Sequence, residues 1–196
     1  MSRLRWIFLF LVLVGGYFLW TDRTHYQPPG VLVAGVPRQT SPGEISLPQK
    51  PGYRISALAR FEIEARVLGR EIYRLDRGAA LAPIDLALGW GPMSDTAVLE
   101  KLTIRQGSRA YSWHGSELPI PRHDIERHSA NMHLIPATPE IGDRLKATHT
   151  GQLVSLTGYL VEVAGDDGWR WRSSLTRDDT GTGACELIWV EDLQTR

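Results

Sequence analysis

The segment YRISALARFEIEARVLG, residues 53–69, decides the fold that we predict for this chain. Its odd-numbered positions, among them Ile55, Phe61 and Ile63, are apolar or small, whereas many of its even-numbered positions carry charged side chains. Apolar residues at every second position indicate a strand with one face packed on a core and the other in solvent. We therefore predict a β-rich domain built outward from a strand over residues 53–69.

The rest of the chain adds further strands and a few short helices to this prediction. A turn at Gly107-Ser108 indicates a hairpin, and the turn at residues 164–168 joins a second pair of strands. We expect strands at residues 102–106, 110–113, 151–163, 169–175 and 184–191. Capping residues predict short helices over residues 96–102, 121–129 and 139–147. The fold class predicted is α+β and β-dominated, with an antiparallel sheet.

An apolar run precedes this domain. Residues 6–20 read WIFLFLVLVGGYFLW, fifteen uncharged residues flanked by Arg5 and Asp22. A run of this length is most simply a helix in the bilayer, although it is shorter than the roughly 20 residues that usually span the hydrocarbon core. We predict that residues 1–21 form a signal-anchor transmembrane helix, with Trp6–Trp20 in the membrane. A cleaved signal peptide is the alternative, but the bulky end of the run is unlike a cleavage site.

The basic residues near the run predict its orientation. Arg3 and Arg5 lie before it, whereas only Arg23 lies close behind it. Since cytoplasmic flanks carry the excess of Lys and Arg, the amino terminus is predicted to be cytoplasmic. The expected location is a bacterial inner membrane, with a single pass and a periplasmic carboxyl-terminal domain.

The prolines indicate the domain organisation. They are frequent in residues 22–52, and proline disfavours long regular structure, so we predict a Pro-rich tether there. Residues 53–196 would then form the extracytoplasmic β-rich domain, for which a division into sub-regions 53–137 and 138–196 is also considered.

Charge and cysteine content narrow the classes of partner. The chain has 22 basic and 22 acidic residues, and it has one cysteine, Cys185. A neutral chain lacks the clustered basic surface that phosphate neutralisation requires, so we expect no nucleic-acid partner. An intramolecular disulfide is impossible with one cysteine, so the fold must depend on its own core.

Histidines gather in the segment 118–136, LPIPRHDIERHSANMHLIP. Imidazole and carboxylate groups together suit zinc, and the candidate ligands are His123, His128 and His133. However, residues 123 and 128 are five positions apart, which on a helix points their side chains in different directions. We therefore expect no metal site, no catalytic residue and no cofactor, with Asn131 and His133 bonded to loop backbone. The alternative is a metal-dependent enzyme using His114, His123, His128 and His133 with Asp85 or Glu126.

The segment GQLVSLTGYLVEV, residues 151–163, followed by a second hairpin strand, resembles the start of small OB-like barrels. This resemblance implies a ligand face that carries aromatic side chains. The candidate binding-surface residues are Trp113, Trp169, Trp171, Arg170 and Arg172, with the two tryptophans of 169–171 on one face and the two arginines on the other. With no net charge, the ligands implied are sugars, peptides or a protein partner.

Three further segments are similar to a group of membrane-anchored bacterial envelope proteins: DLALGWGPMSD (85–95), HSANMHLIP (128–136) and WRWRSSLTRDDTGTGACE (169–186). The resemblance implies a bacterial origin and an envelope location, and it transfers no site residue. The sequence thus predicts a non-enzymatic envelope protein whose β-rich domain binds a protein partner. A carbohydrate-binding OB-like module is a second alternative to the enzyme.

Overall fold

The computed structural model describes residues 3–21, 24–176 and 185–196. The α-helices of this part are α1 (Arg3–Thr21), α2 (Thr96–Leu99), α3 (Arg122–Arg127) and α4 (Pro139–Lys146), with 3-10 helices η1 (Arg77–Ala80) and η2 (Gly91–Ser94). The strands are β1 (Arg38–Thr40), β2 (Tyr53–Ile72), β3 (Ile84–Gly89), β4 (Thr103–Gly107), β5 (Ala110–His114), β6 (Ser129–Pro136), β7 (Leu153–Gly165), β8 (Arg170–Arg172) and β9 (Glu186–Thr195).

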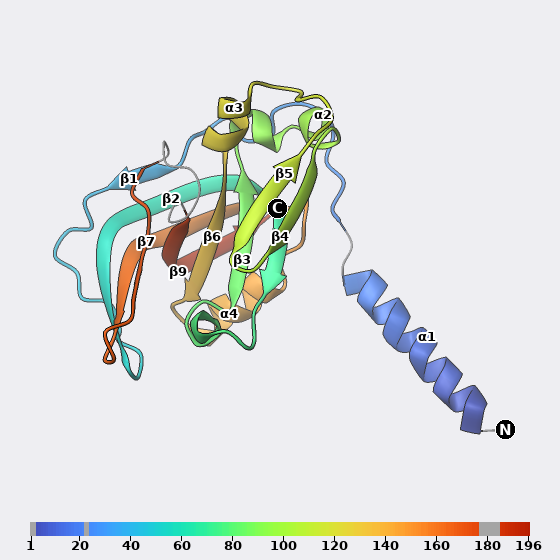
Figure 1. Cartoon of the computed structure of the whole chain (residues 1–196), viewed down its shortest axis with the longest axis horizontal. Helices are drawn as coiled ribbons and strands as arrows, with labels where there is room; N and C mark the ends of the chain where they lie inside the picture. The colour runs from blue at the N-terminus through green and yellow to red at the C-terminus, as the bar shows by residue number, and fades with distance from the viewer. Residues whose placement is uncertain (1–2, 22–23, 177–184) are drawn as a thin grey trace.

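The main sheet has seven strands in the order β1-β2-β3-β6-β9-β7-β8, and β2 also pairs with β7. Five of these strands, β2, β3, β6, β9 and β7, therefore close into a ring (Figure 1). The β-dominated α+β class predicted from the sequence is confirmed. The expectation of an antiparallel sheet was wrong in one place, because β6 and β9 pair in parallel. The alternation of apolar and polar residues along a strand indicates which of its faces is buried. It does not indicate whether the strand pairs in parallel or antiparallel with its neighbour.

Strand β2, the segment that decided the prediction, has two successive partners. Residues 53–66 pair with β7, and residues 66–72 pair with β3. The register shifts between Ala57 and Ala59 on the β7 side and between Val67 and Gly69 on the β3 side. Such bulges bend a strand and increase its twist, which lets one long strand close a ring.

The core of the ring is apolar. It is formed by inward-facing residues of all five strands, including Phe61, Leu86, Met132, Leu156 and Ile188, each at most 1% exposed. The outer faces of the strands carry two further clusters, one beneath β8 and one beneath the hairpin β4–β5, which forms a sheet of its own. The five-stranded ring therefore has apolar layers on both sides of its wall.

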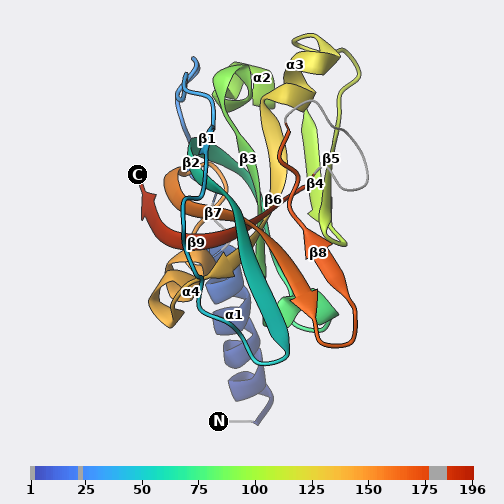
Figure 2. The same ribbon diagram turned by 90° about the vertical axis from the view of Figure 1, so that its left-hand side faces the viewer.

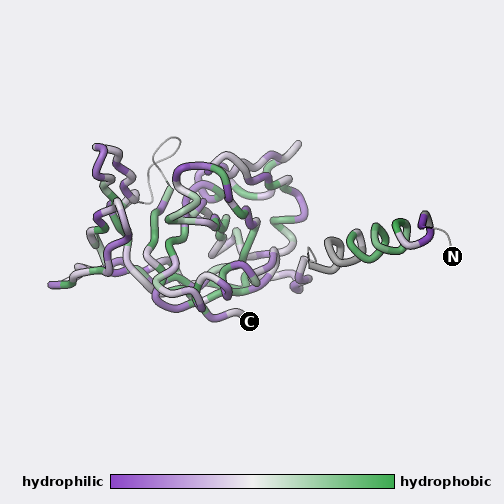
Figure 3. Tube along the Cα trace, turned by 90° about the horizontal axis from the view of Figure 1, so that it is seen from below, coloured by the Kyte–Doolittle hydropathy of each residue, from purple (hydrophilic) through white to green (hydrophobic). Residues whose placement is uncertain are grey.

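Helix α1 covers the segment for which we predicted a membrane span. Figure 3 shows apolar residues along its described turns. Among the described residues, however, no helix is both long and apolar enough to cross a membrane. The described residues therefore give the predicted transmembrane helix no support.

Residues 24–52, the described part of the predicted tether, contact the β domain. The amide of His25 donates to Thr150 O at 2.8 Å, and the amide of Gly91 donates to Val33 O at 2.7 Å. Val33 packs into the core of the ring, and Leu47 packs into the cluster beneath β8. These contacts hold the segment against the domain at several points along its length.

Several local predictions are confirmed. Helix α4 begins as expected, with the Thr138 side chain accepting from the amide of Ile141 and proline in its first turn. Helix α2 is capped by Asp95 as the sequence indicates, although it is shorter than predicted. The segment 129–136, for which we predicted no strand, is strand β6. Because β2 pairs with β7, residues on both sides of position 137 share one sheet.

A buried polar cluster as candidate functional site

The candidate site lies on the outer face of β3 and β6, the side that points away from the core of the ring. Asp85 on β3 faces His133 on β6, and Asn131 lies two residues before His133. The exposed fractions of these residues are 0% for Asp85, 3% for His133 and 2% for Asn131. Polar groups removed from water in this way are costly unless other protein groups satisfy them. The cluster therefore depends on the segments that cover it.

Three segments cover this face: the tip of the hairpin β4–β5, the loop 73–83 between β2 and β3, and the region of β8. Figure 2 shows the hairpin and β8 on the same side of the ring. The hairpin turn has two residues with positive φ, Ser108 at 51° and Arg109 at 63°. Positive φ at both central positions is the geometry of a type I′ turn, which follows the twist of the flanking strands. This turn directs Arg109 toward the cluster.

Arg109 is the centre of the cluster. Its Nη1 donates to Asp85 Oδ1 at 2.9 Å and to Ala82 O at 2.7 Å. Its Nη2 donates to both carboxylate oxygens of Asp76, at 2.8 and 3.0 Å. The guanidinium also stacks on the Tyr73 ring, with Cζ 3.7 Å from the ring centroid, and lies 5.5 Å from the centroid of Trp171. One side chain thus joins the hairpin to all the other covering segments.

These contacts change the pKa of two neighbouring groups. Burial opposes ionisation of Asp76, but the hydrogen bonds and charge of Arg109, together with backbone amides of η1, outweigh it and lower its pKa. Burial raises the pKa of Tyr73, although the backbone amide of Arg109 donates to its hydroxyl. At neutral pH the cluster therefore holds an ionised Asp76 beside an un-ionised Tyr73.

Asp85 has polar neighbours at both carboxylate oxygens. Besides Arg109, Asn131 Nδ2 donates to Oδ2 at 3.3 Å, and His133 Nδ1 lies 2.9 Å from the same oxygen. The direction of the ring nitrogen does not meet hydrogen-bond geometry, and His133 Nδ1 has no hydrogen-bond partner among the described residues. We therefore treat the contact as electrostatic. The strong hydrogen bond to Asp85 is the one from Arg109.

The hairpin contributes a second set of polar contacts to β6. Gln106 Nε2 donates to Asn131 Oδ1 at 2.7 Å, and the hydroxyls of Tyr111 and Ser129 are 2.5 Å apart. Ser129 also donates to Ile125 O at 2.6 Å. Burial raises the pKa of Tyr111 to about 12, despite the hydrogen bond with Ser129. The hairpin is therefore held on the ring by its tip and along the length of β5.

A row of aromatic rings extends from the cluster toward the end of the sheet. His133 and Trp171 have ring centroids 4.8 Å apart, Trp171 and Trp169 are 5.8 Å apart, and Trp169 and Tyr53 are 5.9 Å apart. Arg77 covers Trp169 at 4.7 Å and donates to Asp167 at 2.7 Å, which lowers the pKa of Asp167 to about 2. The row connects the buried cluster to the surface at β8.

The polar contacts of the cluster connect separate segments of the fold. An aspartate beside a histidine is the orienting half of a nucleophilic triad, and such a triad also needs a hydroxyl or thiol bonded to the imidazole. Among the described residues, no Ser, Thr or Cys side chain hydrogen-bonds to His133. Cys185 Sγ lies 4.0 Å from the backbone oxygen of Arg109. The carboxylates of Asp85 and Asp76 are both paired with Arg109, whereas Arg109 Nε and His133 Nδ1 have no hydrogen-bond partner among the described residues.

The structure separates the predicted histidines. His123 is exposed on α3 and lies 3.2 Å from the carboxylate of Asp124, while His128 ends α3 with Nδ1 2.7 Å from Asp124 O. His133 is buried on β6, and His114 is exposed at the end of β5. Among the described residues, no group of three or more His, Cys, Asp or Glu side chains is arranged to hold a metal ion.

The predicted binding-surface residues lie in two places. Trp113 is on β5, where it packs into the cluster beneath the hairpin and Arg122 covers its ring at 5.0 Å. Trp169 and Trp171 belong to the aromatic row. Arg170 and Arg172 both pair with Glu162 on the opposite face of the same strands. Trp113 is therefore separate from the four residues around β8.

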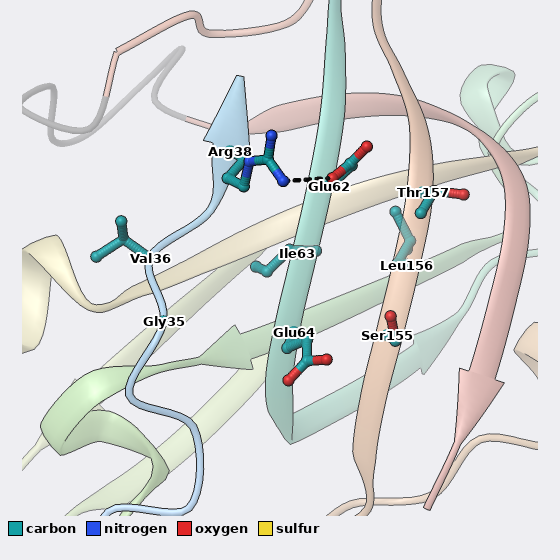
Figure 4. Close-up of a pocket in the computed structure, with 9 residues that line it drawn as sticks. All are labelled: Gly35, Val36, Arg38, Glu62, Ile63, Glu64, Ser155, Leu156 and Thr157. Carbon is teal, nitrogen blue, oxygen red and sulfur yellow. Dashed lines mark ion pairs between the residues drawn. The ribbon is translucent and has the colours of Figure 1, made fainter. Parts of the chain in front are cut away.

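A second hollow lies between residues 35–38 and the strands β2 and β7 (Figure 4). Its volume is about 310 Å³, and its lining includes Glu62, Glu64 and Thr157. Arg38 lies 3.5 Å from Glu62, and Arg196 lies 3.1 Å from Glu64. Both carboxylates are therefore paired with arginine, and the hollow offers less distinctive chemistry than the buried cluster.

Arg109, the residue that organises the cluster, was not among the residues predicted from the sequence. Arg109, Tyr73 and Asp76 come from two loops, and nothing in their local sequence places them beside Asp85. The one available signal was the turn at residues 107–110, where a short hairpin loop presents an arginine at its tip. No protein-family model, curated protein or solved structure matches this chain.

Proposed function

We propose that this protein is a non-enzymatic binding module whose β-rich domain takes a protein partner at the surface around β8. We call this the β8 surface and define it by Trp169, Arg170, Trp171 and Arg172. The observation that carries the proposal is the buried cluster beneath it. Arg109 is paired with both Asp85 and Asp76, and its guanidinium lies 5.5 Å from the ring centroid of Trp171. Rigid support of partly buried tryptophans beside exposed arginine side chains suits recognition.

The arrangement of strands supports an OB-like interpretation of the whole domain. Five strands close a ring, and helix α4 lies between its third strand, β6, and its fourth, β7. OB-like barrels bind ligands on the face of their second and third strands and with the flanking loops. The corresponding face of this chain, on β3 and β6, is covered by the hairpin. The β8 surface lies at the margin of that face and leaves arginine side chains in solvent.

The residue types of the β8 surface favour a protein as the partner. Trp and Arg are among the residues that most often dominate the energetics of protein interfaces, where planar side chains bury large area at low entropic cost. A sugar would be expected to stack on an open aromatic face, but Trp169 is covered on one side by Arg77 and meets Tyr53 edge to face. Glu162 pairs with Arg170 and Arg172, and its negative charge reduces the attraction of the β8 surface for nucleic acid.

A site-specific crosslinking experiment tests the proposal. A photoreactive amino acid is placed at Arg170 in the full chain, in cells that produce the protein, and at Arg105 as the control. Both positions are exposed, and Arg105 lies on β4, away from the β8 surface. We expect a discrete protein adduct from position 170 that is absent from position 105. Identical adducts at both positions, or none at 170, would overturn the proposal. A saturable fluorescence change with an envelope glycan would favour the carbohydrate alternative instead.

We also propose that α1 attaches the domain to a membrane, with the domain on the periplasmic side of a bacterial inner membrane. Consecutive side chains from Trp6 to Leu13 are exposed, between 48% and 69%. An apolar surface of this extent requires cover from lipid or protein. Carbonate extraction of cell membranes tests the attachment of the chain to a membrane. The full chain should stay in the pellet, and a chain lacking residues 1–23 should not. Release of the full chain by carbonate would contradict membrane attachment.

A further inference from the structure

Strand β8 ends the main sheet, and its outer edge has no partner strand among the described residues. The order of the sheet runs from β1 to β8, and β8 pairs only with β7 (Figure 2). A strand edge presents a row of backbone N–H and C=O groups that another extended chain can pair with. Edge strands are for this reason recurrent sites of peptide recognition by strand addition.

The backbone groups of Arg170 and Arg172 are the ones that face outward. The amide of Ser173 donates to Val161 O at 2.9 Å, so residue 173 belongs to a hydrogen-bonded pair with β7. Bonded and non-bonded pairs alternate in an antiparallel ladder. Residues 170 and 172 therefore direct their backbone groups away from β7. Among the described residues, neither backbone forms a hydrogen bond with another segment.

The side chains along this edge carry an excess of positive charge. Arg170 and Arg172 share the single carboxylate of Glu162, at 3.5 and 3.1 Å, and their side chains are 73% and 54% exposed. Arg54 lies on the same face, because Arg54 and Arg170 are both register partners of Ala164. Arg54 forms no ion pair with a described carboxylate. Arg170 and Arg172 against Glu162 leave a surplus of one positive charge beside the free edge, and Arg54 adds positive charge to the same face from the other side of β7.

We propose that the outer edge of β8 accepts an extended, acidic segment of the protein partner as an additional strand. This inference rests on the proposed function and names the class of segment that the β8 surface would bind. Backbone pairing with Arg170 and Arg172 supplies the hydrogen bonds, and carboxylates of the added strand face the arginines. The alternate side chains of the added strand face the side of Trp171, which packs on an apolar cluster and so favours apolar residues. The partner segment thus alternates acidic and apolar residues over about five positions.

Charge complementarity distinguishes this occupant from a second copy of the chain. Two β8 strands paired edge to edge would place Arg170 and Arg172 of one copy opposite the same arginines of the other. Like charges directly opposite each other destabilise a strand pair. The arginines therefore oppose self-pairing, which is a common use of charge on sheet edges, and they favour a strand with acidic residues.

The experiment measures binding of synthetic peptides to the full chain in a mild non-ionic detergent. A fluorescein-labelled peptide with the core Glu-Val-Glu-Val-Glu is compared by anisotropy with a peptide in which lysine replaces each glutamate. We expect saturable binding of the acidic peptide and at least a tenfold weaker affinity for the lysine peptide, because the charge pairs change sign. Amide hydrogen exchange at residues 170 and 172 should slow on binding, since their N–H groups become donors.

Two variants of one residue separate backbone pairing from charge. Arg172→Ala removes the charge and keeps the N–H group, and we expect about a threefold loss of affinity, as is typical of one exposed ion pair. Arg172→Pro also removes the outward N–H group but leaves the bonds to β7 in place, since residue 172 does not donate to β7. We expect at least a further tenfold loss. Unchanged near-ultraviolet circular dichroism verifies that the proline variant remains folded.

The outcomes distinguish this inference from the proposed function. Equal binding by Arg172→Ala and Arg172→Pro would overturn strand addition, while crosslinking at Arg170 would still support a partner on the β8 surface. Equal affinity for the acidic and lysine peptides, or no binding at millimolar concentration, would also overturn the inference. A concentration-dependent dimer that Arg172→Pro abolishes would identify a second copy as the occupant and would overturn it as well.

Discussion

The two faces of strands β3 and β6 are both buried, but they are buried in different ways. The inner face, which includes Leu86 and Met132, packs into an apolar core. The outer face carries Asp85, Asn131 and His133, which are equally removed from water, and polar side chains of the hairpin hydrogen-bond to Asp85 and Asn131. Dispersion and the hydrophobic effect are non-directional, whereas the outer face depends on the position of individual hydrogen-bonding atoms.

This difference predicts different responses to substitution. An apolar core tolerates changes of shape that conserve volume, because no particular atom has to meet another. A buried ion pair does not tolerate loss of one partner, because the remaining charge has no compensation. The outer face is therefore the more fragile of the two, and it connects the ring to the hairpin and to the β8 surface.

The largest effect is expected from Arg109→Ala. This change leaves the fully buried Asp85 without the guanidinium 2.9 Å from its Oδ1. Breaking a buried pair in this way typically costs about 3–5 kcal/mol. We therefore expect the free energy of unfolding, measured by urea denaturation, to fall by about 3 kcal/mol or more. Arg105→Ala is the control, since Arg105 is exposed on the same hairpin and forms no ion pair with a described carboxylate; its effect should stay within about 0.5 kcal/mol.

A second substitution tests whether the loss arises from the unpaired charge. Asp85→Asn in the Arg109→Ala background removes the carboxylate charge and keeps the shape, so part of the lost stability should return. If the loss of stability in the double variant equals the sum of the losses in Arg109→Ala alone and Asp85→Asn alone, the two residues are not coupled. In that case the outer face is held by packing, and the contrast with the inner face does not hold.

The next effect concerns the inner face. Leu86→Ala removes a side chain that is 0% exposed and leaves a cavity, for which we expect a loss of about 3 kcal/mol in the same urea measurement. Leu86→Met conserves volume, and its loss should stay below about 1.5 kcal/mol. A cost for Leu86→Met as high as for Leu86→Ala would show that the inner face also requires a specific shape.

The same contrast explains how far the sequence could predict the fold. Residues 53–69 alternate apolar and charged side chains, and the structure places them in β2. Odd positions from Ala59 to Val67 face the core of the ring, whereas Ile55, before the bulge, packs in the cluster beneath β8. Local capping at Thr138 and Asp95 located the starts of α4 and α2. These signals are local, because alternation and capping involve residues close in the chain.

The remainder could not be predicted because it depends on contacts between distant residues. Arg109 and Asp85 are 24 residues apart, and Arg109 and Asp76 are 33 apart. Nothing near residue 109 indicates a carboxylate partner, and nothing near residue 133 indicates that Trp171 will cover it. The parallel pairing of β6 with β9 is likewise a property of the closed ring, which a single strand does not encode. Histidines were therefore grouped by sequence proximity, whereas the structure separates His123 and His128 from His133.

A smaller effect is expected from pH at the contact between the hairpin and β6. Burial raises the pKa of Tyr111 to about 12, above the ordinary value near 10 that it has in the unfolded chain. A raised folded-state pKa contributes stability that is present below about pH 10 and is lost as pH rises toward 12. Absorbance at 295 nm should show one tyrosine that ionises near pH 12. Tyr111→Phe should remove that step and should make the stability less dependent on pH between 10 and 12. Complete ionisation of all tyrosines by pH 10.5 in the folded chain would contradict burial of this hydroxyl.

The smallest effect is expected at the tip of the hairpin, where a turn geometry that favours Asn or Gly is formed by Ser108 and Arg109. Ser108 has φ of 51°, and its replacement by asparagine, which tolerates the left-handed region better, should raise the free energy of unfolding by about 0.5 kcal/mol. Ser112→Asn, at an exposed position of β5 without positive φ, is the matched control and should give no gain. Because the turn positions Arg109, Ser108→Asn should also slow amide exchange in the hairpin. A gain in stability without slower exchange would mean that the turn and the buried cluster are independent, and that the arginine alone holds the hairpin on the outer face.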